Sequence, residues 1–400
     1  MIGFELSEEQ KVLQQTVRSF VSKEIIPHAQ QWDINGSIDH HVVERLGKLG
    51  ILGLCIPKKY GGVGLDYIST GLACEELEYG ETVFRVLMSV HLGLCSLGLL
   101  QWGSQHLKKL YLPQLASGAK LGAFGLTEPD AGSDVQAMRA KAERSGGSYV
   151  LSGTKSWISL SSVADLFLTF AYTDKSKGVR GISAFLVERK LDGLTTGDYQ
   201  GKLGVRAGST GELHFENVEI PKENLVGQEG EGFKIAMSCL DNGRFTVAAG
   251  SVGLAQAALD ASLAYAKERK TFGLEIGKHQ LIQQKIANMV AGVESARLLV
   301  LRAGWMKNQG LRNSRETALA KWVATRVAVD CADEAIQIHG ANGYSNDYPV
   351  ERFWRNARAA TLYEGTNEIQ TLIQGQYALG YRQDKPLDRT LPPFPFKEDV

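Results

Sequence analysis

The period of the hydrophobic pattern changes twice along this chain, and this constrains the fold more than any other feature. Apolar residues recur at helical spacing through residues 1–120 and again through residues 233–383. Residues 121–232 instead carry short apolar or alternating runs separated by Gly, Asp and Ser, which is typical of strands and turns. The sequence therefore predicts an α+β protein that is mainly α. We expect a helical N-terminal domain, a central antiparallel β domain and a C-terminal helical domain, followed by a proline-containing tail at residues 384–400.

Local patterns support this division. Ser7 and Gln10 form a capping-box pattern at the start of a helix. Residues 166–172 and 182–187 are predicted strands, whereas residues 282–303 place apolar side chains at steps of four and three along one helix face. Further helices are predicted at residues 67–79, 82–102, 106–115, 316–339 and 367–381.

Composition narrows the class of protein. The 44 basic and 44 acidic residues cancel, which removes the electrostatic basis for broad binding to nucleic acid or to an anionic membrane. The hydrophobic share of 44% and the charged share of 22% exclude a disordered or fibrous chain. The five cysteines form no C-x-x-C pair, so we expect neither a disulfide framework nor a zinc knuckle. With no secretory pattern and no apolar run of about 18 residues, we expect a cytoplasmic protein without membrane insertion.

Several common site motifs are missing from the sequence. It has no G-x-G-x-x-G that opens a helix after a strand, no P-loop, no H-E-x-x-H and no G-x-S-x-G. We therefore expect no Rossmann nucleotide site, no metal and no serine-hydrolase elbow. The chemistry must come from another arrangement of residues.

Two segments at the start of the β region carry candidate ligand groups. Residues 124–134 are rich in Gly, Pro, Asp and Ser, so they predict a fixed loop with free amides and hydroxyls, although an ordinary interdomain turn would have the same composition. Trp157 and Ser159 lie two apart on a predicted strand and share one face, where a ring and a donor could cover a flat heterocycle. Taken alone, the pattern favours a core tryptophan.

A third segment, residues 362–370, places Glu364 at the junction of two predicted helices. Gly365 beside it would let another group approach closely. A carboxylate walled by apolar residues has a raised pKa and can act as a base. The alternative from the residues alone is an ordinary charge at a helix end.

Together, these three segments resemble the acyl-CoA dehydrogenase family, in order and spacing. Residues 268–273, 279–280 and 337–344 extend the resemblance, which covers about residues 6 to 381. It implies a helical domain, a β domain and a C-terminal four-helix bundle around FAD, in a homotetramer. It also implies oxidation of an acyl thioester to its trans-2-enoyl form, in which a base removes the α-proton, the β-hydride passes to the flavin, and an electron-transferring flavoprotein then accepts the electrons.

The resemblance assigns roles residue by residue. Glu364 matches the base. Thr is usual where Ser159 stands, but a hydroxyl remains. The residues that match FAD-binding positions, some of them supplied by a neighbouring subunit, are Phe124, Leu126, Thr127, Ser133, Trp157, Ser159, Arg269, Phe272, Gln280, Gln337, Gly340, Ala341, Thr366 and Glu368. The residues that match positions for the thioester substrate are Ser133, Asp241, Arg244 and Gly365.

The acyl group is indicated by Arg85 and Ser89, which share one face of a predicted helix. A buried guanidinium needs an anionic partner. The segment resembles the glutaryl-CoA dehydrogenase branch, in which Arg and Ser at these positions hold a distal carboxylate, and Tyr363 before the base agrees. Alternatively, Arg85 could pair with Glu81 on a solvated face.

Other functions stay open at this point. The acyl chain could be a plain short or medium chain, or the thioester could be carried by an acyl carrier protein. The protein could also be a related oxidase or monooxygenase, or a non-catalytic factor of similar fold. Whether decarboxylation would follow oxidation of a dicarboxylic chain is left undecided by the sequence.

Overall fold

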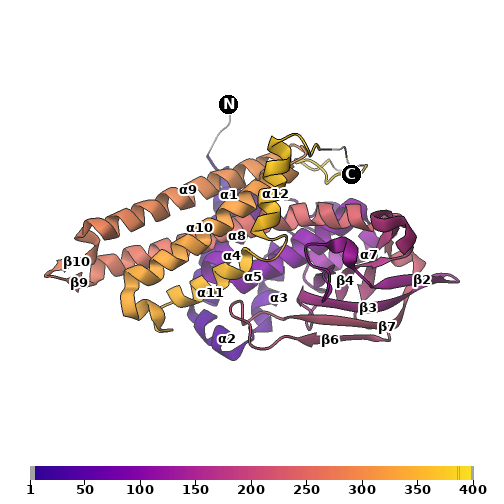
Figure 1. Ribbon diagram of the computed structural model, residues 1–400, viewed down its shortest axis with the longest axis horizontal. Helices are drawn as coiled ribbons and strands as arrows, with labels where there is room; N and C mark the ends of the chain where they lie inside the picture. Colours follow the sequence, from indigo (N-terminus) through magenta and orange to yellow (C-terminus); the bar gives the residue numbers. More distant parts are fainter. Residues whose placement is uncertain (1–4, 385, 387, 398–400) are drawn as a thin grey trace.

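The N-terminal part of the chain folds into helices, of which α1 and α5 pack against α4 (Figure 1). The structure is a computed structural model, and it describes residues 5–384, 386 and 388–397. The predicted capping box is present, because Ser7 Oγ accepts the Gln10 amide and Gln10 Oε1 accepts the Ser7 amide. The helices of this part are α1 (Glu8–Phe20), α2 (Ala29–Asn35), α3 (His40–Lys48), α4 (Tyr67–Gly80), α5 (Thr82–Met88), α6 (Leu97–Trp102) and α7 (Gln105–Ala116).

Helix α4 is buried on nearly every side, so its glutamates lie inside the protein and need partners there. Glu76 is fully buried and pairs with Arg18 of α1. Glu75 pairs with Arg297 of α9 (Gln280–Asn308) at 2.9 Å. Glu78 faces the candidate site described below. The acidic run in α4 therefore joins neighbouring helices instead of forming a solvated face.

The stretch predicted as one helix over residues 82–102 is helical throughout. It consists of α5, a π-helical segment at Ser89–Ser96, and α6. Two helical stretches, Thr82–Trp102 and Gly232–Glu268, are long and apolar enough to span a membrane by length and composition alone. Within their most apolar windows, 94% and 72% of the residues are buried inside the protein, which is typical of core helices.

The central region forms one sheet in the order β6-β7-β3-β2-β4-β5-β8, with β1 beside β4. The prediction of a wholly antiparallel sheet needs correction. β1 runs parallel to β4, from Gly122 opposite Leu166 to Gly125 opposite Thr169, and the single β2–β4 pair is also parallel. The other ladders are antiparallel. The strands are β1 (Gly122–Gly125), β2 (Lys141–Ser145), β3 (Ser148–Ser159), β4 (Leu166–Tyr172), β5 (Ile182–Glu188), β6 (Leu194–Asp198), β7 (Thr210–Pro221) and β8 (Leu225–Val226).

The C-terminal helices form a bundle in which α8 packs against α9 and α10 and also against α4 (Figure 1). Small residues allow the close α8–α4 contact, since a Cβ on Gly253 would lie 1.9 Å from the Glu75 carbonyl oxygen. The elements are α8 (Gly232–Glu268), β9 (Lys270–Thr271), β10 (Leu274–Glu275), α9 (Gln280–Asn308), α10 (Ser314–His339), α11 (Val350–Ala360) and α12 (Asn367–Ala378).

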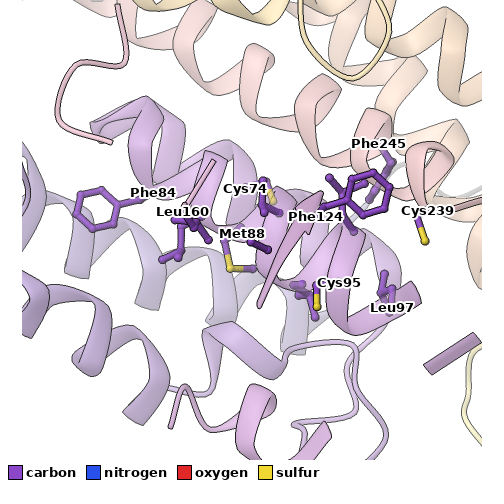
Figure 2. Packing of buried hydrophobic residues seen from close by; sticks show 14 of the residues in the cluster. Cys74, Phe84, Met88, Cys95, Leu97, Phe124, Leu160, Cys239 and Phe245 are labelled. Carbon is purple, nitrogen blue, oxygen red and sulfur yellow. The ribbon is translucent and has the colours of Figure 1, made fainter. Parts of the chain in front are cut away.

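The hydrophobic core is continuous from the N-terminal helices through the sheet to α8. Figure 2 shows part of it, with Phe124 of β1 and with Phe245 and Cys239 of α8. Cys95 packs closely against β1, since a Cβ on Gly122 would lie 2.6 Å from Cys95 Sγ. All five cysteines are buried free thiols.

The tail has no helix or strand in its described part, and it lies along the protein body. Tyr67 donates a hydrogen bond to the Pro392 carbonyl at 2.8 Å, and the Phe394 amide donates one to the Asn308 carbonyl at 2.8 Å. Residues 385, 387 and 398–400 of the predicted tail lie outside the described residues.

Candidate active site

Glu364 lies in the turn between α11 and α12, where two consecutive residues have left-handed backbone angles. Its φ is +53°, and that of Gly365 is +87°. Thr366 then caps α12, because its hydroxyl accepts the Ile369 amide. The Glu364 carboxylate lies against α8, where a Cβ on Gly243 would be 1.9 Å from its Oε2 atom. That oxygen is buried and has no hydrogen-bond partner among the residues that the structure describes.

The surroundings of Glu364 raise its pKa to about 7. Burial disfavours the charged carboxylate and is the largest cause, while the positive charges of Arg85, Lys321 and Arg244 oppose it. A carboxylate with this pKa is suited to accept a proton at neutral pH. The structure thus excludes the alternative of an ordinary solvated charge at a helix end.

Replacing Gly243 with alanine should displace the Glu364 carboxylate, because the added methyl group would overlap with it. The resemblance implies that Glu364 is the base, and a small displacement of a positioned base lowers a rate by about 10²-fold, so we expect a loss of this size. Gly375→Ala is the matched control, since it also lies within a helix but has nothing within 4 Å of the added Cβ. Equal activity of both variants, measured as the rate of flavin reduction, would contradict this placement of the carboxylate.

Arg85 of α5 is 1% exposed, and its positive charge acts on Glu364. Its Nε donates to Glu78 Oε2 at 2.5 Å, its Nη1 donates to Ser89 Oγ at 3.3 Å, and its Nη2 also contacts the Tyr363 hydroxyl. Burial opposes the charge of Arg85, but Glu78 and Tyr363 outweigh it and raise the pKa of the guanidinium. The structure therefore brings Arg85, Ser89 and Tyr363 together, as predicted.

The proposed alternative, an Arg85–Glu81 pair on a solvated face, is wrong. The helical conformation is interrupted between α4 and α5, where Glu81 has an extended backbone with φ −159° and ψ 128°. This interruption turns its side chain towards Arg352 and Asn356. Glu78, two turns before Arg85 and on the preceding helix, takes the place that helical spacing would give to Glu81.

One face of helix α8 packs against both Glu364 and the residues around Arg85. Gly243 lies against Glu364, Thr246 bonds Ser89 Oγ at 2.7 Å, and a Cβ on Gly250 would be 2.0 Å from Glu78 Oε2. These three positions lie on one helix face over seven residues, or about 10 Å. Sequence reasoning missed Thr246, Gly243, Gly250 and Glu78. The three small α8 residues at helical spacing were a usable indication of a close approach.

Two other predicted substrate residues lie on α8, and one of them, Arg244, contacts the Glu364 turn. Arg244 Nε donates to the Glu364 carbonyl at 3.2 Å, and its Nη1 pairs with Asp241 at 3.2 Å. Both contacts orient the guanidinium beside the turn. Asp241 also lines a cavity of about 430 Å³ together with Ser238, Asn242 and Lys307.

The predicted flavin loop and β3 are joined to each other. The Ser156 amide donates to the Thr127 carbonyl at 2.9 Å, and buried Lys155 pairs with Glu128 at 2.8 Å. Phe124 and Leu126 are buried in the loop's base, whereas Ser133 is exposed and Ser159 half-buried. Trp157 is 63% exposed, with a φ of +58°, and its ring lies 4.6 Å from that of Tyr199. The expectation of a core tryptophan is therefore wrong.

A second group of predicted flavin residues lies elsewhere in the chain. The β9–β10 hairpin is at the end of the helical bundle away from the sheet (Figure 1). Within one chain, the structure does not bring the predicted flavin residues of the hairpin, the start of α9 and the end of α10 to the Glu364 turn. Phe272 at the hairpin tip is 96% exposed. The other exposed residues of this group are Arg269, Gln280, Gln337, Gly340 and Ala341, and Glu368 at the start of α12 is also exposed.

Comparison with known proteins gives this arrangement a family. Three family models match the chain: the acyl-CoA dehydrogenase N-terminal domain at residues 7–119, the middle domain at residues 123–218 and the C-terminal domain at residues 230–379. Glutaryl-CoA dehydrogenase of Desulfococcus multivorans is 44% identical over 387 residues, or 96% of this chain and 99% of that protein. The chain belongs to the acyl-CoA dehydrogenase family.

Other acyl-CoA dehydrogenases are similar to a comparable degree. The short-chain specific acyl-CoA dehydrogenase of Clostridium acetobutylicum is 42% identical over 93% of this chain and 98% of that protein. The solved glutaryl-CoA dehydrogenase–glutaryl-CoA complex has a TM-score of 0.93 at 44% identity, and the match covers 95% of this chain and 98% of that chain. Acyl-CoA dehydrogenases are FAD-dependent oxidoreductases, so this protein is an enzyme of that class.

The residues present fit FAD. Trp157 offers an exposed ring, and Ser159, two residues later, offers a half-buried hydroxyl, a pair of groups that suits a flat heterocycle with polar edges. The Ser156 hydroxyl and Glu364 Oε2 are buried without a partner among the described residues, as expected beside a bound polar group.

Proposed function

We propose that this enzyme oxidises an acyl-CoA thioester to its trans-2-enoyl form, with Glu364 as the base that takes the proton from C2. The buried, unpartnered Oε2 atom of Glu364 carries this proposal. Because an α-proton of a thioester is weakly acidic, the carbonyl must be polarised by fixed donors in a dry site. The Glu364 backbone amide is our candidate donor. FAD, when bound, supplies the acceptor for the hydride that leaves C3.

We assign the flavin to Phe124, Leu126, Thr127, Ser133, Trp157 and Ser159 of one subunit. We also propose that the hairpin and the end of α10 reach the flavin from a neighbouring subunit of a homotetramer. The 96% exposure of Phe272 supports a subunit contact at the hairpin. We further propose an electron-transferring flavoprotein as the electron acceptor and a cytoplasmic location.

We propose a short acyl chain that ends in a carboxylate, as in glutaryl-CoA. Arg85 is buried against the same face of α8 as Glu364, and a guanidinium in such a place suits a carboxylate ligand. One observation favours a plain short chain instead: Glu78 already balances the charge of Arg85. A thioester carried by an acyl carrier protein is a further alternative.

An anaerobic substrate screen tests the proposed function. The FAD-loaded protein should lose its yellow colour when mixed with an acyl-CoA, most rapidly with glutaryl-CoA if the carboxylate assignment holds. Faster bleaching by butyryl-CoA would favour the plain short chain. Rapid return of the colour in air would instead indicate an oxidase, and no bleaching by any thioester would contradict the proposal.

The rate of flavin reduction should increase with pH and level off above about pH 7, because the base must be deprotonated and the pKa of Glu364 is about 7. The charged groups that act on it are Arg85, Lys321 and Arg244. Stopped-flow reduction at saturating substrate, from about pH 5.5 to about pH 9, measures this dependence. A rate that stays constant or falls across this range would contradict the assignment.

A further inference from the structure

The turn that holds Glu364 has a costly backbone conformation. A non-glycine residue with positive φ is uncommon, and such a conformation persists only where surrounding contacts hold it. Glu364 has this conformation and Gly365 follows it with φ +87°. A Cβ on Gly365 would lie 2.6 Å from Gln370 Nε2, so the turn is also tightly enclosed. The surrounding structure must hold this turn in place.

Lys321 of α10 contacts the turn directly. It is 0% exposed, and its Nζ donates to the Gly365 carbonyl at 2.9 Å and to Asn367 Oδ1 at 3.1 Å. Thr325, one helical turn later, donates to the same Asn367 oxygen at 3.1 Å. Residues on one face of α10 thus hold both ends of the segment from Gly365 to Asn367.

Two other helices also hold the turn, one through a neutral amide and one through the Arg244 guanidinium. Gln370 of α12 donates to the Gly365 carbonyl at 2.8 Å, and Arg244 of α8 donates to the Glu364 carbonyl at 3.2 Å. Burying a charged lysine is costly unless the ammonium group is hydrogen-bonded and lies near an opposite charge. Among the described residues, the Lys321 ammonium group donates hydrogen bonds to the Gly365 carbonyl and the Asn367 amide oxygen, and not to a carboxylate. Burial is the largest cause and lowers the pKa of Lys321 to about 7, with the positive charges of Arg244 and Arg85 acting in the same direction. The negative charges of Glu364 and Glu368 oppose this shift and favour the charged form of Lys321.

We infer that Lys321 is a positioning residue for the catalytic base. Its ammonium group holds the left-handed Glu364–Gly365 turn through the Gly365 carbonyl, and its charge stabilises the Glu364 carboxylate. This inference rests on the proposed function of Glu364. It assigns Lys321 no contact with the substrate and no proton transfer.

Lys321→Met tests the inference, because it removes the charge and both hydrogen bonds but keeps most of the side-chain volume. We expect flavin reduction at saturating substrate to slow by about 10- to 100-fold, since a small displacement of a base has effects of this size. The substrate dissociation constant should change little. The midpoint of the pH profile should move to higher pH, because Glu364 loses a neighbouring positive charge.

Lys285→Met is the matched control. Lys285 pairs with Glu334 across α9 and α10, so this variant removes a lysine from the same helix pair without touching the turn. It should keep the wild-type rate and pH profile. A Lys321→Met rate within about 2-fold of wild type, or a loss confined to substrate binding, would overturn the inference.

If Lys321→Met does not fold with FAD, Lys321→Gln takes its place, because glutamine keeps a hydrogen-bond donor but no charge. It should show the same shift of the pH midpoint, and an unshifted midpoint would overturn the inference. Wild-type protein separates the two proposals. If no acyl-CoA reduces wild type, the proposed function fails. If wild type is reduced and Lys321→Met matches it, only the role of Lys321 fails.

Discussion

Glu364→Gln should slow the reduction of bound FAD by acyl-CoA by about 10²- to 10⁴-fold, the usual contribution of a positioned base. Glutamine has nearly the shape of the carboxyl group, so the space against Gly243 stays filled. It cannot accept the C2 proton. Stopped-flow absorbance under anaerobic conditions measures the rate, and the absorbance of the unreduced protein measures the FAD content.

Thermal stability provides the control for Glu364→Gln. The folded protein raises the pKa of this carboxyl to about 7, so above that pH the folded state carries a buried charge that costs stability. Glutamine removes this cost, and Tm at about pH 8 should be equal to or higher than that of wild type. A variant that keeps its FAD and is reduced at the wild-type rate would exclude Glu364 as the base.

Arg85→Met should lower kcat/KM for glutaryl-CoA by about 10²-fold or more, the range seen when one partner of a buried charged pair is removed. The same substitution should change kcat/KM for butyryl-CoA by much less, since a methyl-ended chain needs no cation. The ratio of the two values is the measurement, because it cancels any general damage to the site.

The single variant leaves Glu78 buried without its cation, which can destabilise the protein. The double variant Arg85→Met/Glu78→Leu removes both charges and is the matched control. It should recover the stability and keep the butyryl-CoA activity, but not the glutaryl-CoA activity. Equal losses on both substrates in the double variant would contradict the carboxylate assignment and favour the plain short chain.

Much of the fold could be predicted from hydrophobic period. The predicted strand at residues 166–172 is β4, and the apolar face at residues 282–303 belongs to α9. The parallel pairing of β1 with β4 could not be predicted, because a four-residue strand has no periodic pattern that reports its direction. Such pairing depends on contacts between segments far apart in the sequence.

The candidate site could be predicted in part. The resemblance placed Arg85, Ser89, Tyr363 and Glu364 in one site, and the structure brings them together. The partner of Arg85 could not be predicted by helical spacing. Spacing rules hold only within one continuous helix, and the helical conformation is interrupted at Glu81. For Trp157, the residues alone favour burial of a strand tryptophan, whereas the resemblance places its ring at the flavin, and the ring is 63% exposed.

Proton exchange at C2 of a bound thioester tests the central claim most directly. An acyl-CoA analogue with sulfur in place of C3 cannot lose a hydride, so exchange of its C2 protons with deuterated solvent reports the base alone. The FAD-loaded wild-type protein should catalyse this exchange, and Glu364→Gln, with FAD bound, should not. Exchange at equal rates in both proteins would contradict the account.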